Sequence, residues 1–292
     1  MTPRAAWKMA IRLPTLTAAV APVFVGTGVA IHEDAFDLLP ALAALFGAIC
    51  LQIGANFAND VFDFKRGADT ADRLGPPRAT QMGALAPRQV YAGMVIVFAL
   101  ATLAGVYLVY AGGLPVVAIG VASIIAAIIY TGGPWPVGYH ALGDVFTFVF
   151  FGLVAVVGTY YVQAGEVTGL AWAAAIPIGC TVTMILVVNN LRDIGTDSHT
   201  GKRTLGVIMG DRGTRAWYFA NLAVAYAVPL IAALTLDLPG MALVALSIPW
   251  AYPLVRAIAG GTSGRALNPI LKGTARFNLI FAVFLAIGIA IS

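Results

Sequence analysis

Residues 89–110 have the sequence QVYAGMVIVFALATLAGVYLVY, 22 residues without a charged side chain. This stretch opens a longer run, from Gln89 to Gly143, that contains no Lys, Arg, Asp or Glu. Roughly 20 apolar residues in a helix cross the ~30 Å hydrocarbon core of a membrane, so this run alone predicts two spans and a turn. Of the 292 residues, 60% are hydrophobic and 10% are charged, and the mean hydropathy is +0.89. The composition excludes a soluble globular protein and predicts an all-α membrane protein.

Nine apolar segments can be marked along the chain, and none has a charged residue away from its ends. They are residues 11–31, 38–59, 89–110, 113–131, 142–163, 168–190, 215–236, 238–258 and 276–292. We therefore expect nine transmembrane helices in a single domain over residues 1–292. An odd number of spans would place the two termini on opposite sides of the membrane.

The basic residues are distributed unevenly between the predicted loops. All 17 Lys and Arg residues lie in, or within three residues of, the stretch before the first segment and the loops after the second, fourth, sixth and eighth, which places them on one side. The positive-inside rule then predicts a cytoplasmic N-terminus and an external C-terminus. The net charge of +4 describes this asymmetry across the membrane, and nucleic acid is not expected as a partner.

Six of the 13 acidic residues lie in two stretches, NFANDVFDFKRGADTAD at 56–72 and NNLRDIGTD at 189–197. Each stretch follows directly on an apolar segment. If the helices continue, Asn56, Asp60 and Asp63 share one stripe. The Asn-x-x-x-Asp pattern recurs at Asn189 and Asp193, four spans later, which predicts two pseudo-repeated halves with spans two and six equivalent.

Carboxylates at the C-terminal ends of helices are unfavourable, because that end carries partial negative charge. Two such clusters meeting near the membrane would also repel each other. A divalent cation would resolve this conflict, and carboxylate and amide oxygens favour magnesium over zinc. The alternative is that these acids are ordinary interfacial groups neutralised by Lys65, Arg66 and Arg192.

Magnesium bound by few carboxylates keeps water and substrate phosphate oxygens as further ligands. Arg78, Lys202 and Arg203 flank the two acidic stretches and suit a diphosphate. No Gly-x-x-x-x-Gly-Lys-Ser/Thr motif is present, which argues against a nucleotide triphosphatase. The sequence therefore predicts a phosphorylated substrate that approaches from a lipid environment.

Several further motifs accompany the acidic stretches in order along the chain. They are NDVFDFKRG (59–67), GPPR (75–78), YTGGP (130–134), YHALGD (139–144), GTYY (158–161), NNLRD (189–193) and GKRTL (201–205). Together they resemble the UbiA superfamily of intramembrane prenyltransferases, and within it the branch of 1,4-dihydroxy-2-naphthoate polyprenyltransferases of menaquinone biosynthesis. The resemblance covers nearly the whole chain.

This resemblance implies nine helices around a central cavity capped by cytoplasmic loops, in a bacterial plasma membrane. It implies transfer of a polyprenyl group from polyprenyl diphosphate to 1,4-dihydroxy-2-naphthoate, which gives demethylmenaquinol, diphosphate and CO2. Two Mg2+ ions are expected, with membrane lipid around the protein. The sequence sets neither the prenyl chain length nor the oligomeric state.

The resemblance also assigns roles to individual residues. The implied metal ligands are Asn56, Asp60, Asp63, Asp69, Asp193 and Asp197. The implied substrate-binding residues are Arg12, Arg78, Lys202, Arg203, Asn190 and Tyr160. Tyr130 is expected beside the reacting carbon, and Asp193 is the predicted acceptor of the ring proton.

Two departures from the family pattern stand out. The broader family often spaces its first motif Asp-x-x-x-Asp, but position 64 is Phe64 here, so Asp63 must serve instead. Many members carry a Lys soon after the tyrosine that matches Tyr130, and this loop has none before Asp144.

Other functions remain open. A prenyltransferase of the same family could act on 4-hydroxybenzoate, homogentisate or a haem. A secondary transporter also uses repeats and buried acids, although its ionisable groups should lie near the membrane midplane. A CDP-alcohol phosphotransferase would gather its acids in one segment, whereas this chain separates them by four spans.

Overall fold

The computed structural model describes residues 1–68 and 73–292, and the described residues form helices and no strands. The first half comprises α1 (Pro3–Ile11), η1 (Leu13–Leu16), α2 (Thr17–His32), α3 (Leu38–Lys65), α4 (Pro87–Gly112), α5 (Leu114–Ile129) and η2 (Val137–Tyr139). The second half comprises α6 (Gly143–Thr147), η3 (Phe148–Val154), α7 (Ala155–Ala164), α8 (Gly169–His199), α9 (Leu205–Thr235), η4 (Pro239–Ser247), α10 (Ile248–Ala259), η5 (Gly264–Ala266) and α11 (Leu267–Ala290). The predicted all-α class is confirmed.

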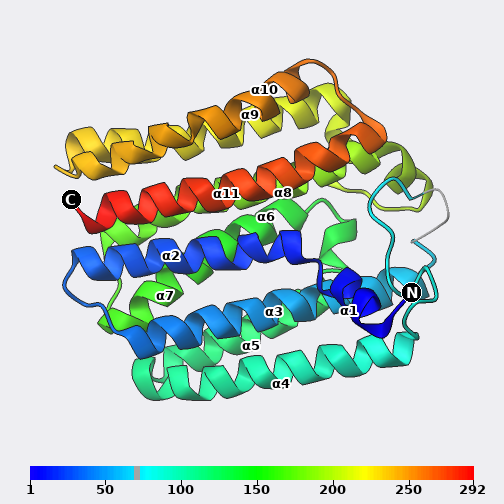
Figure 1. Ribbon diagram of the computed structural model, residues 1–292, viewed down its shortest axis with the longest axis horizontal. Coiled ribbons are helices and arrows are strands. Elements are labelled where there is room, and N and C mark those ends of the chain that lie inside the picture. The colour runs from blue at the N-terminus through cyan, green and yellow to red at the C-terminus, as the bar shows by residue number, and fades with distance from the viewer. Residues whose placement is uncertain (69–72) are drawn as a thin grey trace.

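Within the described residues, eight continuous helical stretches are long and apolar enough to cross a membrane. The remaining apolar helix, α5, has 16 residues and packs beside α3 and α4. The N- and C-termini lie at opposite ends of the bundle (Figure 1). A ninth crossing by α5 and the orientation in the membrane remain predictions.

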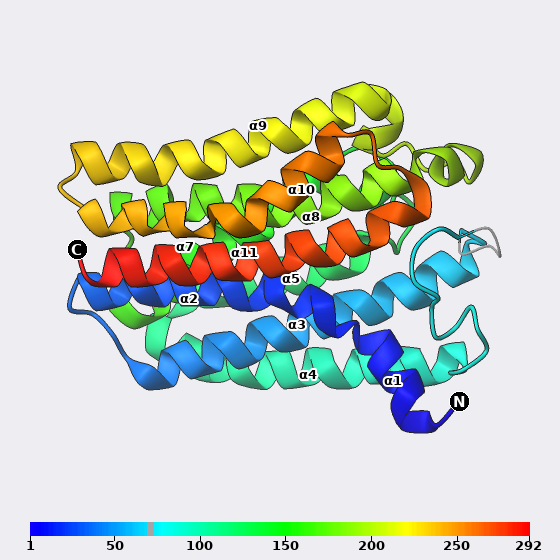
Figure 2. The same ribbon diagram turned by 45° about the horizontal axis from the view of Figure 1, so that its top comes forward.

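The polar loops gather at one end of the bundle. Residues 66–68 and 73–86, the loop 130–142 and the short connection 200–204 all lie at the end that holds the N-terminus (Figure 2). The apolar segments 168–190 and 215–236 leave residues 191–214 as the connection after the sixth predicted span. Instead α8 continues to His199, and α9 begins at Leu205. Asp193 and Asp197 therefore lie on the last turns of a regular helix, as their spacing predicts.

The helix that follows, α9, is broken near its start. Gly210 has a φ of 67°, a value that favours glycine, and the helix changes direction there. Beside this break the hydroxyl of Thr214 donates to the carbonyl oxygen of Gly210, 2.7 Å away.

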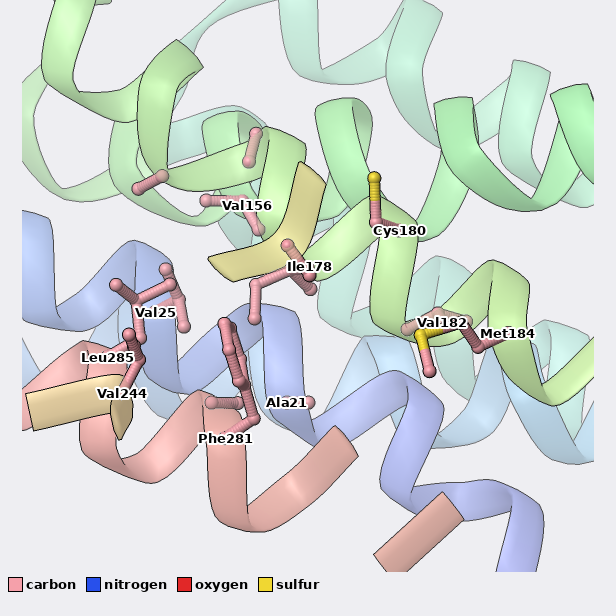
Figure 3. Close-up of a cluster of buried hydrophobic side chains, with 14 of the residues drawn as sticks. Ala21, Val25, Val156, Ile178, Cys180, Val182, Met184, Val244, Phe281 and Leu285 are labelled. Atoms are coloured by element: carbon pink, nitrogen blue, oxygen red, sulfur yellow. The ribbon is translucent and has the colours of Figure 1, made fainter. Parts of the chain in front are cut away.

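The larger hydrophobic core joins the N-terminal half of the chain to the C-terminal half. Val25 of α2, Ile178 of α8 and Phe281 of α11 are fully buried within one cluster (Figure 3). Small residues let these backbones approach closely: a Cβ at Gly26 would lie 2.5 Å from the carbonyl oxygen of Val156. Close packing of this kind holds membrane helices together, since lipid supplies no hydrophobic drive between them.

Candidate functional site

Two cavities meet inside the bundle. A polar cavity of about 250 Å³ lies at the loop-bearing end, and an apolar cavity of about 330 Å³ extends from it between α2, α3, α4, α5 and α7. Five residues line both cavities: Gln52, Asn59, Tyr130, Thr147 and Phe151. A ligand that occupied both would have a polar head and a hydrocarbon tail joined at this boundary.

The two acidic stretches come together in the polar cavity. Asp63 of α3 lines its wall, as do Asp193 and Asp197 of α8. Three amides from the same helices, Asn56, Asn189 and Asn190, also line it. Both acidic stripes are helical and converge on the same cavity.

Asp63 is 1% exposed and accepts from three side chains. Nη2 of Arg78 lies 2.8 Å from its Oδ2, and the hydroxyl of Tyr139 lies 2.9 Å from its Oδ1. Nζ of Lys202 lies 3.5 Å from Oδ1. A buried carboxylate requires such partners, and here they come from three different loops.

Asp193 is paired with its own neighbour. Nε and Nη2 of Arg192 lie 2.7 and 2.5 Å from the two carboxylate oxygens of Asp193. Of the three cations that could neutralise these acids, Arg192 forms an ion pair with Asp193. Nζ of Lys65 lies 6.0 Å from the ring centroid of Tyr91, and Arg66 donates to the carbonyl oxygen of Gly133.

Arg12 reaches the polar cavity from the corner between α1 and η1. Its φ is 54°, and Asn56 fixes this corner by donating to the carbonyl oxygen of Ile11 and to Thr15, each at 2.9 Å. The Nη2 atom of Arg12 is buried and has no hydrogen-bond partner among the described residues. A buried cationic donor of this kind favours an anionic ligand.

Tyr130 lies at the boundary of the two cavities. An unperturbed tyrosine phenol has a pKa of about 10. The group therefore stays protonated at neutral pH and can donate a hydrogen bond.

The oxygen ligands around the polar cavity fit magnesium. No group of three His, Cys, Asp or Glu residues that could hold a metal ion occurs in the described part of the chain. Magnesium requires fewer, since one or two carboxylates with substrate phosphates and water complete its octahedron. Asp63, Asp193 and Asp197 supply such carboxylates, and the absence of any His or Cys from the cavity wall argues against zinc.

Not every predicted site residue reaches the cavity. Arg203 is exposed and lies outside the cavity lining. Tyr160 is fully buried and donates to Glu33 at the opposite end of the bundle. Asp60 is buried beneath residues 79 and 80, outside the lining. The predicted metal ligand Asp69 lies outside the described residues.

The sequence reasoning missed other residues of the site. Tyr139 donates to Asp63, and its ring centroid lies 4.6 Å from Nζ of Lys202. Arg73 and Gln52 also line the polar cavity. Asp144 accepts from the indole of Trp217 at 3.1 Å and from Asn190 at 3.5 Å, and so holds a cavity amide in place. Tyr139 falls in the YHALGD motif, but nothing in that motif indicates its partner 76 residues earlier.

These features define a helical membrane protein in which a polar cavity lined by acidic and basic side chains adjoins an apolar one. The chain belongs to the UbiA prenyltransferase family, whose model matches residues 19–290. This confirms the family that the motifs indicate.

The chain is also similar to characterised members over nearly its whole length. It is 39% identical to the 1,4-dihydroxy-2-naphthoate octaprenyltransferase of Mycobacterium tuberculosis, covering 97% of this chain and 96% of the relative. It is 35% identical to the protein of the same name from Escherichia coli, covering 98% and 96%.

Two solved structures share the fold. A UbiA homolog from Aeropyrum pernix matches with a TM-score of 0.70 at 18% identity, over 94% of this chain and 97% of that one. A UbiA homolog from Archaeoglobus fulgidus, bound to DMAPP and Mg2+, matches with a TM-score of 0.68 at 14% identity, over 98% and 99%.

Proposed function

We propose that this protein transfers a polyprenyl group from polyprenyl diphosphate to 1,4-dihydroxy-2-naphthoate, with release of diphosphate and CO2, as a step of menaquinone biosynthesis. The acceptor is taken from the names of the similar proteins. The observation that carries the proposal is the junction of the two cavities at Tyr130. A polyprenyl diphosphate has the polar head and apolar tail that such a junction accommodates.

The apolar cavity would receive the prenyl chain. Its wall combines aliphatic residues with small ones such as Ala48, Gly105 and Gly120. Because small side chains leave room between helices, a flexible hydrocarbon can lie along the bundle and exclude water from the reacting carbon.

The polar cavity would bind the diphosphate. Arg12, Arg73, Arg78 and Lys202 line it, and Nη2 of Arg12 is open for an anion. Guanidinium groups bind phosphate oxygens through paired hydrogen bonds, and they stabilise the charge that develops as the diphosphate departs.

Magnesium suits the same cavity, where Asp63, Asp193 and Asp197, with Asn56, would hold two ions. When bound, the metal neutralises charge on the leaving diphosphate. The neighbours bound to DMAPP and Mg2+ or to Cd2+ support the use of a divalent ion.

Tyr130 would act where the allylic carbon gains positive charge as the C–O bond breaks. Its ring face can stabilise the cation while its phenol remains protonated. The naphthoate ring then attacks this carbon through a ring carbon that bears hydrogen, and that proton must leave. One proton returns to the neighbouring ring carbon when its carboxylate departs as CO2, so the protons balance. Asp193 is our proposed acceptor, because its carboxylate lines the polar cavity at the end of α8.

The location of the cavity supports an active site at the cytoplasmic face of a bacterial plasma membrane. The cavity lies at the end of the bundle that carries the loops rich in basic residues. The positive-inside rule assigns that end to the cytoplasm.

Another aromatic acceptor is the nearest competing function. The test reconstitutes the protein in lipid vesicles with a polyprenyl diphosphate, Mg2+ and one acceptor at a time: 1,4-dihydroxy-2-naphthoate, 4-hydroxybenzoate or homogentisate. We expect prenylated product from the naphthoate alone, and none with EDTA. Product from 4-hydroxybenzoate at a higher rate would transfer the proposal to that acceptor, and full activity in EDTA would exclude the metal.

A further inference from the structure

The carboxylates of Asp60 and Asp63 have different hydrogen-bond partners. Asp60 is fully buried and does not line the polar cavity. Its Oδ2 accepts from the backbone N–H of Ala79 at 3.2 Å, and its Oδ1 accepts from the N–H of Thr80 at 3.3 Å and from the Thr80 hydroxyl. Both oxygens of this carboxylate are used to hold residues 79 and 80.

The same segment is attached a second time, near residue 74. Nη1 of Arg192 donates to Asn268 at 2.9 Å, and Asn268 in turn donates to the carbonyl oxygen of Leu74 at 2.9 Å. The guanidinium of Arg192 also lies against Gly75, where a Cβ would be 2.8 Å from Nη2. A methyl group at Gly75 would therefore displace the guanidinium of Arg192 from this position.

Two cavity cations, Arg73 and Arg78, lie within residues 73–80. The rigid Pro76–Pro77 dipeptide lies between the two attachment points, which are residues 74–75 and residues 79–80. Nη2 of Arg78 reaches Asp63 only because the backbone of residues 79 and 80 is fixed next to it. These hydrogen bonds to residues 74, 79 and 80 therefore fix the position of Arg73 and Arg78 in the wall of the polar cavity.

We propose that Asp60 is a positioning residue that fixes residues 73–80, and with them Arg78, against the polar cavity. It does not bind the metal ion, in contrast to the role expected from its place in the motif. This inference rests on the proposed function only in that Arg78 would face the diphosphate.

The experiment compares Asp60→Asn, Thr80→Val and Gly75→Ala in purified protein. Thr80→Val removes one hydroxyl donor and leaves every carboxylate in place. Three quantities are measured: trypsin cleavage after Arg78, the KM for polyprenyl diphosphate, and binding of Mn2+ with inorganic diphosphate by electron paramagnetic resonance. Thr235→Val, which loses a hydroxyl bond to Ile231 far from the cavity, is the matched control.

We expect faster cleavage in all three variants and a KM raised about 10-fold, the effect of losing a hydrogen bond to a charged group. Mn2+ binding should stay within about twofold of wild type, a change of less than half a kcal/mol. The Thr235→Val control should behave as wild type in every assay.

The inference is overturned if Asp60→Asn loses Mn2+ binding while Thr80→Val matches wild type, because that pattern belongs to a metal ligand. Should Asp60→Asn fail to fold, Thr80→Val and Gly75→Ala decide the matter alone: wild-type cleavage and KM in both would reject the positioning role. If the wild-type protein prenylates no naphthoate, the proposed function fails, but the cleavage and Mn2+ comparisons still test the attachment.

Discussion

The hydroxyl of Tyr139 lies 2.9 Å from Oδ1 of Asp63 and joins the loop 130–142 to α3 at the wall of the polar cavity. The same ring lies under Nζ of Lys202, 4.6 Å from its centroid. Tyr139 therefore orients both Asp63 and Lys202, although it lies in a different segment from either of them.

Tyr139→Phe separates these two contacts, because it removes the hydroxyl and keeps the ring. We expect kcat to fall about 10- to 100-fold, as a buried carboxylate loses a donor worth about 1.5–3 kcal/mol. Steady-state rates of prenyl transfer measure the effect. Tyr161→Phe is the matched control, since Tyr161 donates to the carbonyl oxygen of Gly112 away from the polar cavity. Equal losses in both variants would show that Tyr139 matters only for folding.

Asp63 provides the direct test of metal binding. Asp63→Asn should lower prenyl transfer at least about 100-fold and weaken Mn2+ binding, because the site loses one of its few carboxylates. Asp211→Asn makes the same change in an exposed ion pair with Arg215 and should alter neither quantity. Mn2+ affinity is read by electron paramagnetic resonance, and an unchanged affinity in Asp63→Asn would remove this residue from the metal site.

The regular part of the site could be predicted from the sequence. A spacing of seven residues places Asn56 and Asp63 on one helical stripe, and a spacing of four does the same for Asp193 and Asp197. The structure brings both stripes to one cavity. Helical periodicity is a local property, so a single sequence reveals it.

The contacts between loops could not be predicted in this way. Asp60 and Asp63 share one stripe, yet Asp60 meets the backbone of residues 79 and 80 while Asp63 meets side chains from distant loops. Tyr160 lies in a motif that the family resemblance assigns to the cavity, but its hydroxyl meets Glu33. The partner of each polar group depends on how the irregular segments fold. The periodicity of the sequence carries no information about those contacts.

The close approach of α2 and α7 gives a prediction about stability. A methyl group at Gly26 would lie 2.5 Å from the carbonyl oxygen of Val156, a backbone atom that cannot move aside easily. Gly26→Ala should therefore destabilise the protein by about 1–3 kcal/mol, the usual range for overpacking. Gly195→Ala in α8 adds a methyl group where no atom lies within 4 Å, and it should match or exceed wild type. Thermal unfolding in detergent compares them, and equal midpoints would mean that the two helices can separate without cost.

Arg12 and Arg203 make the sharpest contrast between sequence and structure, because the motifs assign both to the diphosphate. The Nη2 atom of Arg12 is buried beside the polar cavity without a partner among the described residues, whereas Arg203 is exposed and lies outside the lining. Arg12→Gln should raise the KM for polyprenyl diphosphate about 10- to 100-fold, the loss expected for a charge-assisted hydrogen bond to phosphate. Arg203→Gln removes the same charge and should leave the KM within about twofold, since an exposed cation is screened by water and salt. Rates measured over a range of diphosphate concentration at saturating naphthoate give both values. Equal increases would mean that Arg203 turns into the cavity when substrate binds and contributes to its cationic wall as Arg12 does.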